Sequence, residues 1–202
     1  MLARNILKLT LPCVGLFLAN SAYSTTVTFD NVGPLPRQGF TISNIDGLAF
    51  TSPLLNGVYV IDASNLYGHI NLAQSGANAA SLDNGPPLTI QLLGGGAFTF
   101  DSVYFGSTHA LNETQSFQVR GYRSGQQVYS STVSAWNSPH LFSANWTNID
   151  ALSVKWSGSI GYGVMDTLSY STSSVPLPAA VWLFGSGSLG LIGIARKRRP
   201  AL

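Results

Sequence analysis

Charged residues are scarce in this sequence, and they are unevenly placed. Of the 202 residues, 10 are Lys or Arg and 8 are Asp or Glu. Two positive residues lie near the N-terminus and four lie together at 196–199. The region between them holds four positive against eight acidic residues, a net charge of −4. Because nucleic-acid binding requires a basic surface, this composition excludes nucleic acid as an expected partner.

Cysteine is almost absent, since Cys13 is the only one in the chain. It lies in the opening segment MLARNILKLTLPCVGLFLANSAYSTT, where two positive residues precede an apolar run at 9–19 and small residues follow. This order predicts a secretory signal peptide over 1–24 and export by the Sec machinery. Removal of the peptide would leave a mature chain from Thr25 without disulfides or a thiol nucleophile.

A sustained helical period is missing between residues 25 and 173, and short alternating runs separated by Gly, Asn and Ser stand in its place. The run SFQVRGY (116–122) and the run QQVYSSTV (126–133) flank a Ser-Gly pair, which predicts a β-hairpin. The pattern favours an all-β domain, an antiparallel jelly-roll-like β-sandwich. The expected strands are 26–30, 47–51, 57–62, 69–73, 88–93, 97–105, 116–122, 126–133, 151–156 and 165–171.

A recognisable catalytic constellation is also missing. Glu113 is the only Glu, the three histidines (His69, His109 and His140) are far apart in sequence, and no G-x-S-x-G motif occurs. The prediction is therefore a protein that is not an enzyme. The alternative is a secreted hydrolase acting on polysaccharide or ester, which would need convergent carboxylates or a Ser-His pair in one cleft.

Two aspartates flank the predicted domain. Asp30 ends the first predicted strand and Asp166 begins the last one. Because terminal strands of jelly-roll domains often run side by side, the two carboxylates are candidate ligands of a structural Ca²⁺, supplemented by Asn31 and backbone carbonyls. The alternative is that both residues only cap strands or turns. No other cofactor is expected.

Several aromatic residues of the domain are candidates for stacking against sugar rings, although aromatic residues of sandwiches more often pack in the core or in cross-strand pairs. The pattern does not choose between the two roles. The candidates are Tyr104, Tyr122, Tyr129, Trp136 and Trp146.

The C-terminal segment 174–202 has three parts: a Pro-containing motif, an uncharged apolar run at 179–195, and the basic cluster Arg196, Lys197, Arg198 and Arg199. As a helix, 179–195 would extend about 26 Å, slightly less than the roughly 30 Å hydrocarbon core of a bilayer. Positive residues stay on the cytoplasmic side. The segment therefore predicts one transmembrane helix with residues 25–173 outside the cytoplasm.

This segment resembles the PEP-CTERM sorting signal of exported bacterial proteins, also known as the ice-binding-protein C-terminal domain. Val175, Pro176, Leu177 and Pro178 occupy the place of its Val-Pro-Glu-Pro box, with Leu177 at the Glu position. Trp182 and the small residues Gly185 and Gly187 fit the VPLPAA-x-WLFGSG variant.

The resemblance implies that a membrane-embedded exosortase cuts near the box and passes the ectodomain from the inner membrane to the cell envelope or extracellular matrix, in bacteria that make exopolysaccharide. The predicted domain over 25–173 is more weakly similar to galactose-binding-like jelly-roll domains. Together these features predict a non-catalytic surface or matrix β-sandwich associated with exopolysaccharide; a permanently anchored membrane protein is the further alternative. The stretches that carry the weaker likeness are TFDN (28–31), FTFDSVYFG (98–106), FQVRGYRSGQQVYSSTV (117–133), NWTNIDALSVKW (145–156) and VMDTLSY (164–170).

Overall fold

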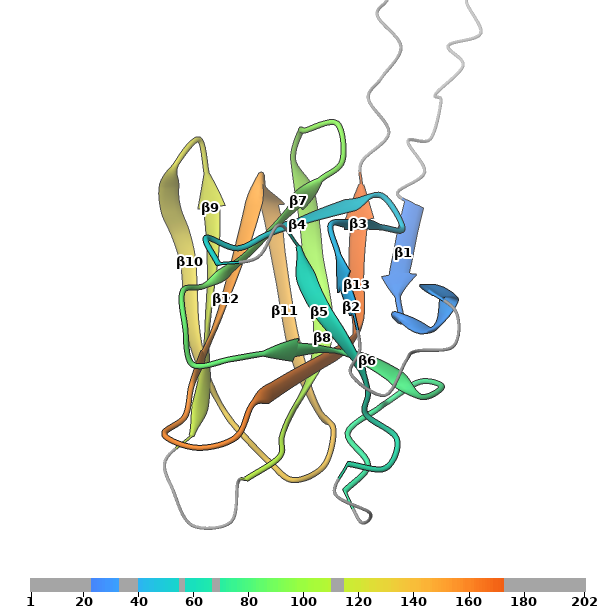
Figure 1. Cartoon of the computed structure of the whole chain (residues 1–202). Coiled ribbons are helices and arrows are strands. Elements are labelled where there is room, and N and C mark those ends of the chain that lie inside the picture. The colour runs from blue at the N-terminus through green and yellow to red at the C-terminus, as the bar shows by residue number, and fades with distance from the viewer. Residues whose placement is uncertain (1–22, 33–39, 55–56, 67–69, 110–114, 173–202) are drawn as a thin grey trace, which may run out of the picture. The chain divides into compact units, whose positions relative to one another are not determined.

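Two antiparallel β-sheets pack face to face in the computed structural model, which describes residues 23–32, 40–54, 57–66, 70–109 and 115–172 (Figure 1). The predicted antiparallel β-sandwich is confirmed. The seven-stranded sheet has the order β11 (His140–Ile149), β8 (Phe98–Ser107), β13 (Gly163–Thr172), β6 (Asn78–Leu82), β5 (Val58–Asp62) and β2 (Phe40–Ile42), with β1 (Tyr23–Val27) also paired to β13. The six-stranded sheet has the order β10 (Gln126–Ser134), β9 (Ser116–Arg123), β12 (Ala151–Ser157), β7 (Leu88–Leu92), β4 (Leu48–Thr51) and β3 (Asn44–Ile45).

The core lies between the sheets and, on strands such as β9 and β12, follows from the alternation of buried and outward-facing residues. On β12, Leu152, Val154 and Trp156 are fully buried and the residues between them are half-buried. The rings of Phe105 on β8 and Phe117 on β9 stack across the two sheets, with centroids 4.3 Å apart. Because successive side chains of a strand point to opposite faces, one apolar face per strand is sufficient to build this core.

The hairpin between β9 and β10 turns at Ser124 and Gly125, as the sequence predicts. Both residues have positive φ, 48° and 76°, as a two-residue type I′ turn requires. Asp46 and Gly47 make the same kind of turn between β3 and β4, with φ of 46° and 81°. The Tyr170 hydroxyl of β13 donates to the Asp46 carbonyl at 2.6 Å, so this turn is tied to the opposite sheet.

Strands β1 and β6 share one edge of β13. β6 pairs with Gly163–Met165 and β1 with Leu168–Thr172. Between these two stretches the register of β13 shifts and Thr167 has a φ of 49°, which marks a β-bulge. The two strands therefore leave a junction beside Asp166, at the point where one neighbour of β13 ends and the other begins.

The predicted strand over 69–73 is wrong for its described part. Ile70 makes only an isolated bridge to Leu66, and the Asn71 side chain accepts the Ala73 N–H at 3.0 Å, closing a turn. Instead this segment covers the outer side of β6 and β13 with a second apolar cluster. The buried members of that cluster are Ala63, Leu72, Ala73, Ala79 and Val164.

Within the described part of the chain, no helix is long and apolar enough to cross a membrane. The predicted signal peptide (1–24) lies outside the described residues except for its last two positions, where β1 begins at Tyr23. The predicted helix over 179–195 and the sorting residues lie wholly outside them.

Candidate functional site

The junction beside β13 brings together the two aspartates predicted as metal ligands. Asp166 is 1% exposed. One of its carboxylate oxygens (Oδ2) accepts the backbone N–H groups of Gln74 and Ser75 at 2.8 and 2.9 Å, and the other accepts that of Thr167 at 2.6 Å. The carboxylate therefore holds the loop before β6 against the bulge of β13.

Asp30 lies on the other side of the same loop. Its Oδ1 accepts the N–H groups of Ala77 and Asn78, each at 3.0 Å, and its Oδ2 accepts the Ser75 hydroxyl at 3.0 Å. The preceding residue, Phe29, is fully buried with a φ of 60°, which is unusual for a bulky side chain. The hydrogen bonds of Asp30 fix the chain immediately after this strained residue.

The electrostatics of the junction are unfavourable for two ionised carboxylates. Burial raises the pKa of Asp166 above its ordinary value, and the nearby Asp30 carboxylate raises it further. Its backbone hydrogen bonds oppose this effect and lower the pKa, but the net direction is upward. The partial positive charges of the surrounding N–H groups therefore compensate the burial of Asp166 only in part.

The groups around the two aspartates are mostly hydrogen-bond donors, which bears on the predicted Ca²⁺. Such an ion takes six to eight oxygen ligands, whereas the groups that face Asp30 and Asp166 are chiefly N–H donors with one shared hydroxyl, that of Ser75. Within the residues that the structure describes, no group of three or more His, Cys, Asp or Glu side chains gathers. The contacts seen here are those of the alternative, in which both aspartates cap turns, and the Ca²⁺ site stays a prediction.

The predicted aromatic candidates do not form one platform. Tyr129 and Trp146 stack on each other, with centroids 5.3 Å apart and planes 7° from parallel, and both pack against the core. Trp136 is 52% exposed and contacts the ring of His140. Tyr122 lies on the outer face of its sheet, because its neighbour Gly121 is buried on the inner face. Tyr129 and Trp146 therefore serve packing, the more common role, whereas Tyr104 is half-buried on β8.

An open hollow forms instead along β5 and β6 and was not predicted. It measures about 410 Å³, and we call it the β5–β6 hollow. Tyr59 and Ser81 are register partners on the two strands and both are half-buried. The hollow is lined by Tyr59, Ile61, Asp62, Leu66, Ser81, Asp83 and Tyr162.

The polar groups of the hollow differ in how far they are engaged. The Asp62 carboxylate accepts the N–H and the hydroxyl of Ser64, at 3.0 and 2.6 Å, and so caps a turn. The Asp83 side chain is exposed, and neither its carboxylate nor the Tyr59 hydroxyl has a hydrogen-bond partner among the described residues. These two groups are therefore available to a ligand.

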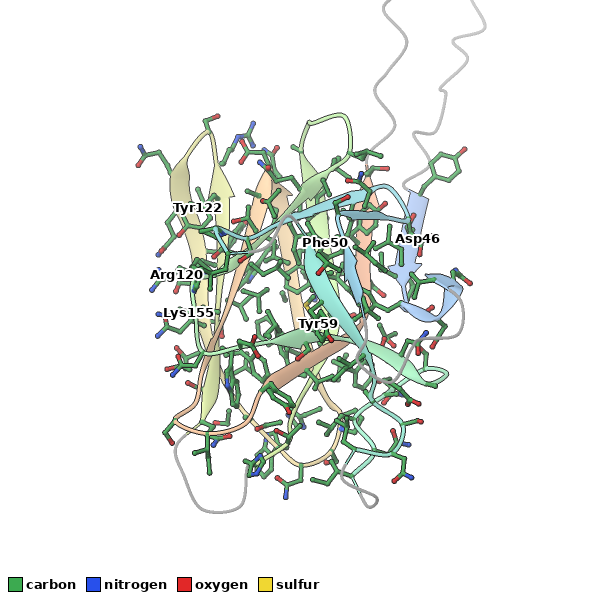
Figure 2. The ribbon with its side chains drawn as sticks, in the orientation of Figure 1. Asp46, Phe50, Tyr59, Arg120, Tyr122 and Lys155 are labelled. Carbon is green, nitrogen blue, oxygen red and sulfur yellow. The ribbon has the colours of Figure 1, made fainter. Side chains whose placement is uncertain are left out.

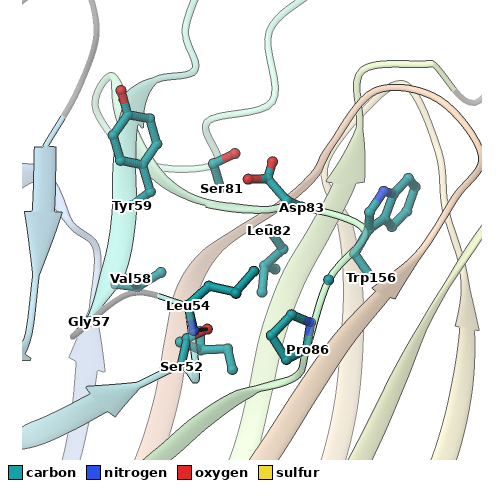
Figure 3. Close-up of a pocket in the computed structure, with 12 residues that line it drawn as sticks. Ser52, Leu54, Gly57, Val58, Tyr59, Ser81, Leu82, Asp83, Pro86 and Trp156 are labelled. Atoms are coloured by element: carbon teal, nitrogen blue, oxygen red, sulfur yellow. Dashed lines mark hydrogen bonds between the residues drawn. The ribbon is translucent and has the colours of Figure 1, made fainter.

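A narrow pocket of about 60 Å³ continues from the hollow and shares Tyr59, Ser81 and Asp83 with it. Figure 3 shows these three side chains on the same side of the strands, with Trp156 at the wall beyond Asp83. Trp156 is fully buried, and its Nε1–H has no hydrogen-bond partner within the described structure. Such an orphaned donor is rare in a protein interior.

The described histidines do not form a catalytic pair. The Nδ1 atom of His109 lies 3.1 Å from the Thr108 hydroxyl oxygen, but that hydroxyl also accepts the Tyr162 N–H at 3.1 Å, and Thr108 is 3% exposed. The contact therefore fixes a loop. His140 contacts Trp136, and His69 and Glu113 lie outside the described residues. The hydrolase alternative stays a prediction: Asp62 and Asp83 both line the β5–β6 hollow, and the Asp62 carboxylate caps a turn.

No protein-family model and no curated protein matches the chain. Among solved structures, it is similar to the K2 cleaved adhesin domain of Lys-gingipain, with 13% identity over 74% of this chain and 100% of that one and a TM-score of 0.44. It is also similar to TmCBM61 in complex with β-1,4-galactotriose, with 15% identity over 69% and 97% and a TM-score of 0.38. A third is the CBM22-1–GH10 part of Clostridium thermocellum xylanase 10B with xylohexaose, with 14% identity over 74% and 28% and a TM-score of 0.39. Likeness at this level defines neither a family nor a ligand.

Proposed function

We propose that residues 25–173 form a non-catalytic glycan-binding β-sandwich, carried by an exported protein of the cell surface or extracellular matrix. The β5–β6 hollow is the observation that supports this function. A sugar ring presents apolar C–H faces and a rim of hydroxyl groups, so its binding site must combine apolar or aromatic surface with hydrogen-bond acceptors. The hollow combines Tyr59, Tyr162 and two aliphatic side chains with the Asp83 carboxylate.

Binding of neutral polysaccharides to the full-length protein tests the function. We expect at least one of β-1,4-galactan, xylan, dextran and the host's own exopolysaccharide to bind in calorimetry or affinity electrophoresis. Tyr59→Ala and Asp83→Asn should each weaken binding about tenfold or more, because each removes an unengaged group of the hollow. Trp136→Ala, an exposed aromatic residue outside the hollow, should bind like the wild type.

The outcomes are distinct. Loss confined to the two hollow variants supports the proposal, with circular dichroism showing that they fold. Equal loss in Trp136→Ala, or no binding to any of the four polymers, contradicts it.

The C-terminal segment supports the second part of the proposal, sorting at the inner membrane. The box at Val175–Pro178, the apolar run 179–195 and the basic cluster 196–199 would hold the protein in the membrane after Sec export. An exosortase would then cut near the box and pass the sandwich to the envelope or matrix. The ectodomain would meet the exopolysaccharide there.

The intact mass of the protein recovered from its native host tests this part. With the exosortase present, we expect a species that begins near Thr25 and ends near Val175–Pro178. Deletion of the exosortase should leave a species that retains Arg196–Arg199. If both strains yield the longer species, the protein is permanently anchored, and the sorting proposal is wrong.

A further inference from the structure

Positive charge within the described part of the chain is confined to one sheet. Its three Lys and Arg residues are Arg120 and Arg123 on β9 and Lys155 on β12, neighbouring strands of the six-stranded sheet. None of the seven described Asp residues is within a strand of that sheet, although Asp46 and Asp150 lie in turns at the ends of its strands. The domain is acidic overall, yet the outer face of this sheet carries only positive charge.

Two of these cations lie on that outer face. Arg120 alternates with Val119 and Gly121, which are buried on the inner face, and Lys155 alternates with the buried Val154 and Trp156. Both side chains therefore point away from the core. Figure 2 shows Tyr122, Arg120 and Lys155 in succession along this side of the sandwich.

The register places the two cations as diagonal neighbours. Arg120 is the partner of Ser153, and Lys155 is two residues further along β12, opposite Gln118. Diagonal neighbours on one face are about 7–8 Å apart, and the small Ser153 side chain leaves a dip between the two long ones. A hollow of about 210 Å³ results, lined by Gln118, Arg120, Ser153, Lys155 and Pro87. We call this surface the cationic face.

The cations of this face have no internal counter-charge. The Arg120 guanidinium donates to the Gln118 side-chain oxygen at 3.1 Å, and no carboxylate of the described residues pairs with Arg120 or Lys155. Arg123 differs, because its guanidinium donates to the Asn148 carbonyl at the end of the sheet. Two unpaired cations on either side of a polar dip are complementary to an anionic group.

We propose that the cationic face binds an acidic polysaccharide, with a carboxylate of the polymer between Arg120 and Lys155 and above Ser153. Tyr122 lies one pleat beyond Arg120 on the same face, where its ring offers a stacking surface for the next sugar.

Nucleic acid fits this face less well. A duplex carries one charge per about 1.7 Å, whereas a polyuronic chain carries one per sugar and matches two separated cations. The inference rests on the proposed glycan-binding function but names a second surface and its ligand class.

The test measures binding of full-length protein to polygalacturonate, with β-1,4-galactan as the neutral probe and duplex DNA as the dense polyanion. Arg120→Gln and Lys155→Gln remove charge and keep length, and Arg123→Gln is the matched control off the face. We expect each face variant to weaken polygalacturonate binding about tenfold, and the control to change it less than about twofold. Raising the salt concentration from about 0.05 to 0.5 M should weaken wild-type binding strongly, because salt screens charge pairs.

Each outcome separates the two proposals. Charge-dependent loss in Arg120→Gln and Lys155→Gln, with unchanged binding in Tyr59→Ala, supports the cationic face. Binding of galactan through Tyr59 without polygalacturonate binding overturns this inference and leaves the proposed function standing. Equal losses in all three charge variants, or tighter binding to DNA than to polygalacturonate, also overturn it. If the wild type binds none of the glycans, the proposed function fails together with this inference.

Discussion

Replacing Trp156 by alanine is expected to lower the free energy of unfolding by about 3–5 kcal/mol. The indole is fully buried and lies 4.9 Å from the Phe117 ring, centroid to centroid. It fills its site closely, since a Cβ added to Gly158 would lie within 2.6 Å of two indole atoms. The backbone cannot easily collapse into the space that alanine would leave. Denaturant unfolding of both proteins measures the loss.

Trp156→Phe is the informative partner of that variant. The Nε1–H of Trp156 has no hydrogen-bond partner in the described structure, so its removal relieves an unsatisfied donor while an aromatic ring remains. We expect a loss of only about 1–2 kcal/mol. If Trp156→Phe were as unstable as Trp156→Ala, the N–H group would have to make a hydrogen bond, and its orphaned state would be refuted.

Replacing Asp166 by alanine is expected to lower the free energy of unfolding by about 2–4 kcal/mol. The change leaves the N–H groups of Gln74, Ser75 and Thr167 without their acceptor in a nearly inaccessible site. Relief of the repulsion from Asp30 offsets part of this loss. Hydrogen exchange should report where the effect begins, because the loop before β6 should lose protection first. A stability equal to wild type would mean that the junction does not anchor this loop.

The pH dependence of Asp166 has a defined sign. Its pKa is raised in the folded state above the ordinary value of 3.8, so the folded state holds the proton more tightly than the unfolded state does. The stability contributed by the protonated form is present below pH 3.8 and is lost as the pH rises through the folded-state pKa. The stability of the wild type relative to Asp166→Asn should therefore fall as the pH rises from below 3.8 through the folded-state pKa. A rise over this range would contradict the raised pKa.

Strands with regular alternation could be predicted, and those without it could not. β11 was missed as a strand because Asn145 and Asn148 have positive φ and shift its register twice. Each bulge breaks the alternation on which the prediction depends. β6 was missed for another reason: Asn78, Ala79 and Ala80 are buried in succession, which small residues permit where a loop covers the outer side. Neither the register shifts of β11 nor the consecutive buried residues of β6 produce a two-residue alternation in the sequence, so this pattern does not reveal either strand.

The candidate sites, too, could be predicted from the sequence only in part. Asp30 and Asp166 lie at one junction, as the sequence predicts, although Asp30 is in a short 3-10 helix (Asp30–Val32) after β1 and Asp166 is inside β13 rather than at its start. The sequence did not show that the loop 74–78 would fill the space between them with N–H donors. The β5–β6 hollow draws Tyr59, Asp83 and Tyr162 from three separate parts of the chain, and no local motif links them.

By itself, the sequence determined the strand-rich domain, the Ser124–Gly125 hairpin and the residues that face the core, because alternation and turn chemistry are local properties. It also carries the N-terminal and C-terminal segments on which the sorting proposal rests. Only the tertiary structure decided which strands are neighbours, and therefore which polar side chains meet. Arg120 and Lys155 are 35 residues apart in the chain and lie on one face because β9 pairs with β12. Pairing between distant strands depends on the packing of the whole sandwich, which local sequence does not encode.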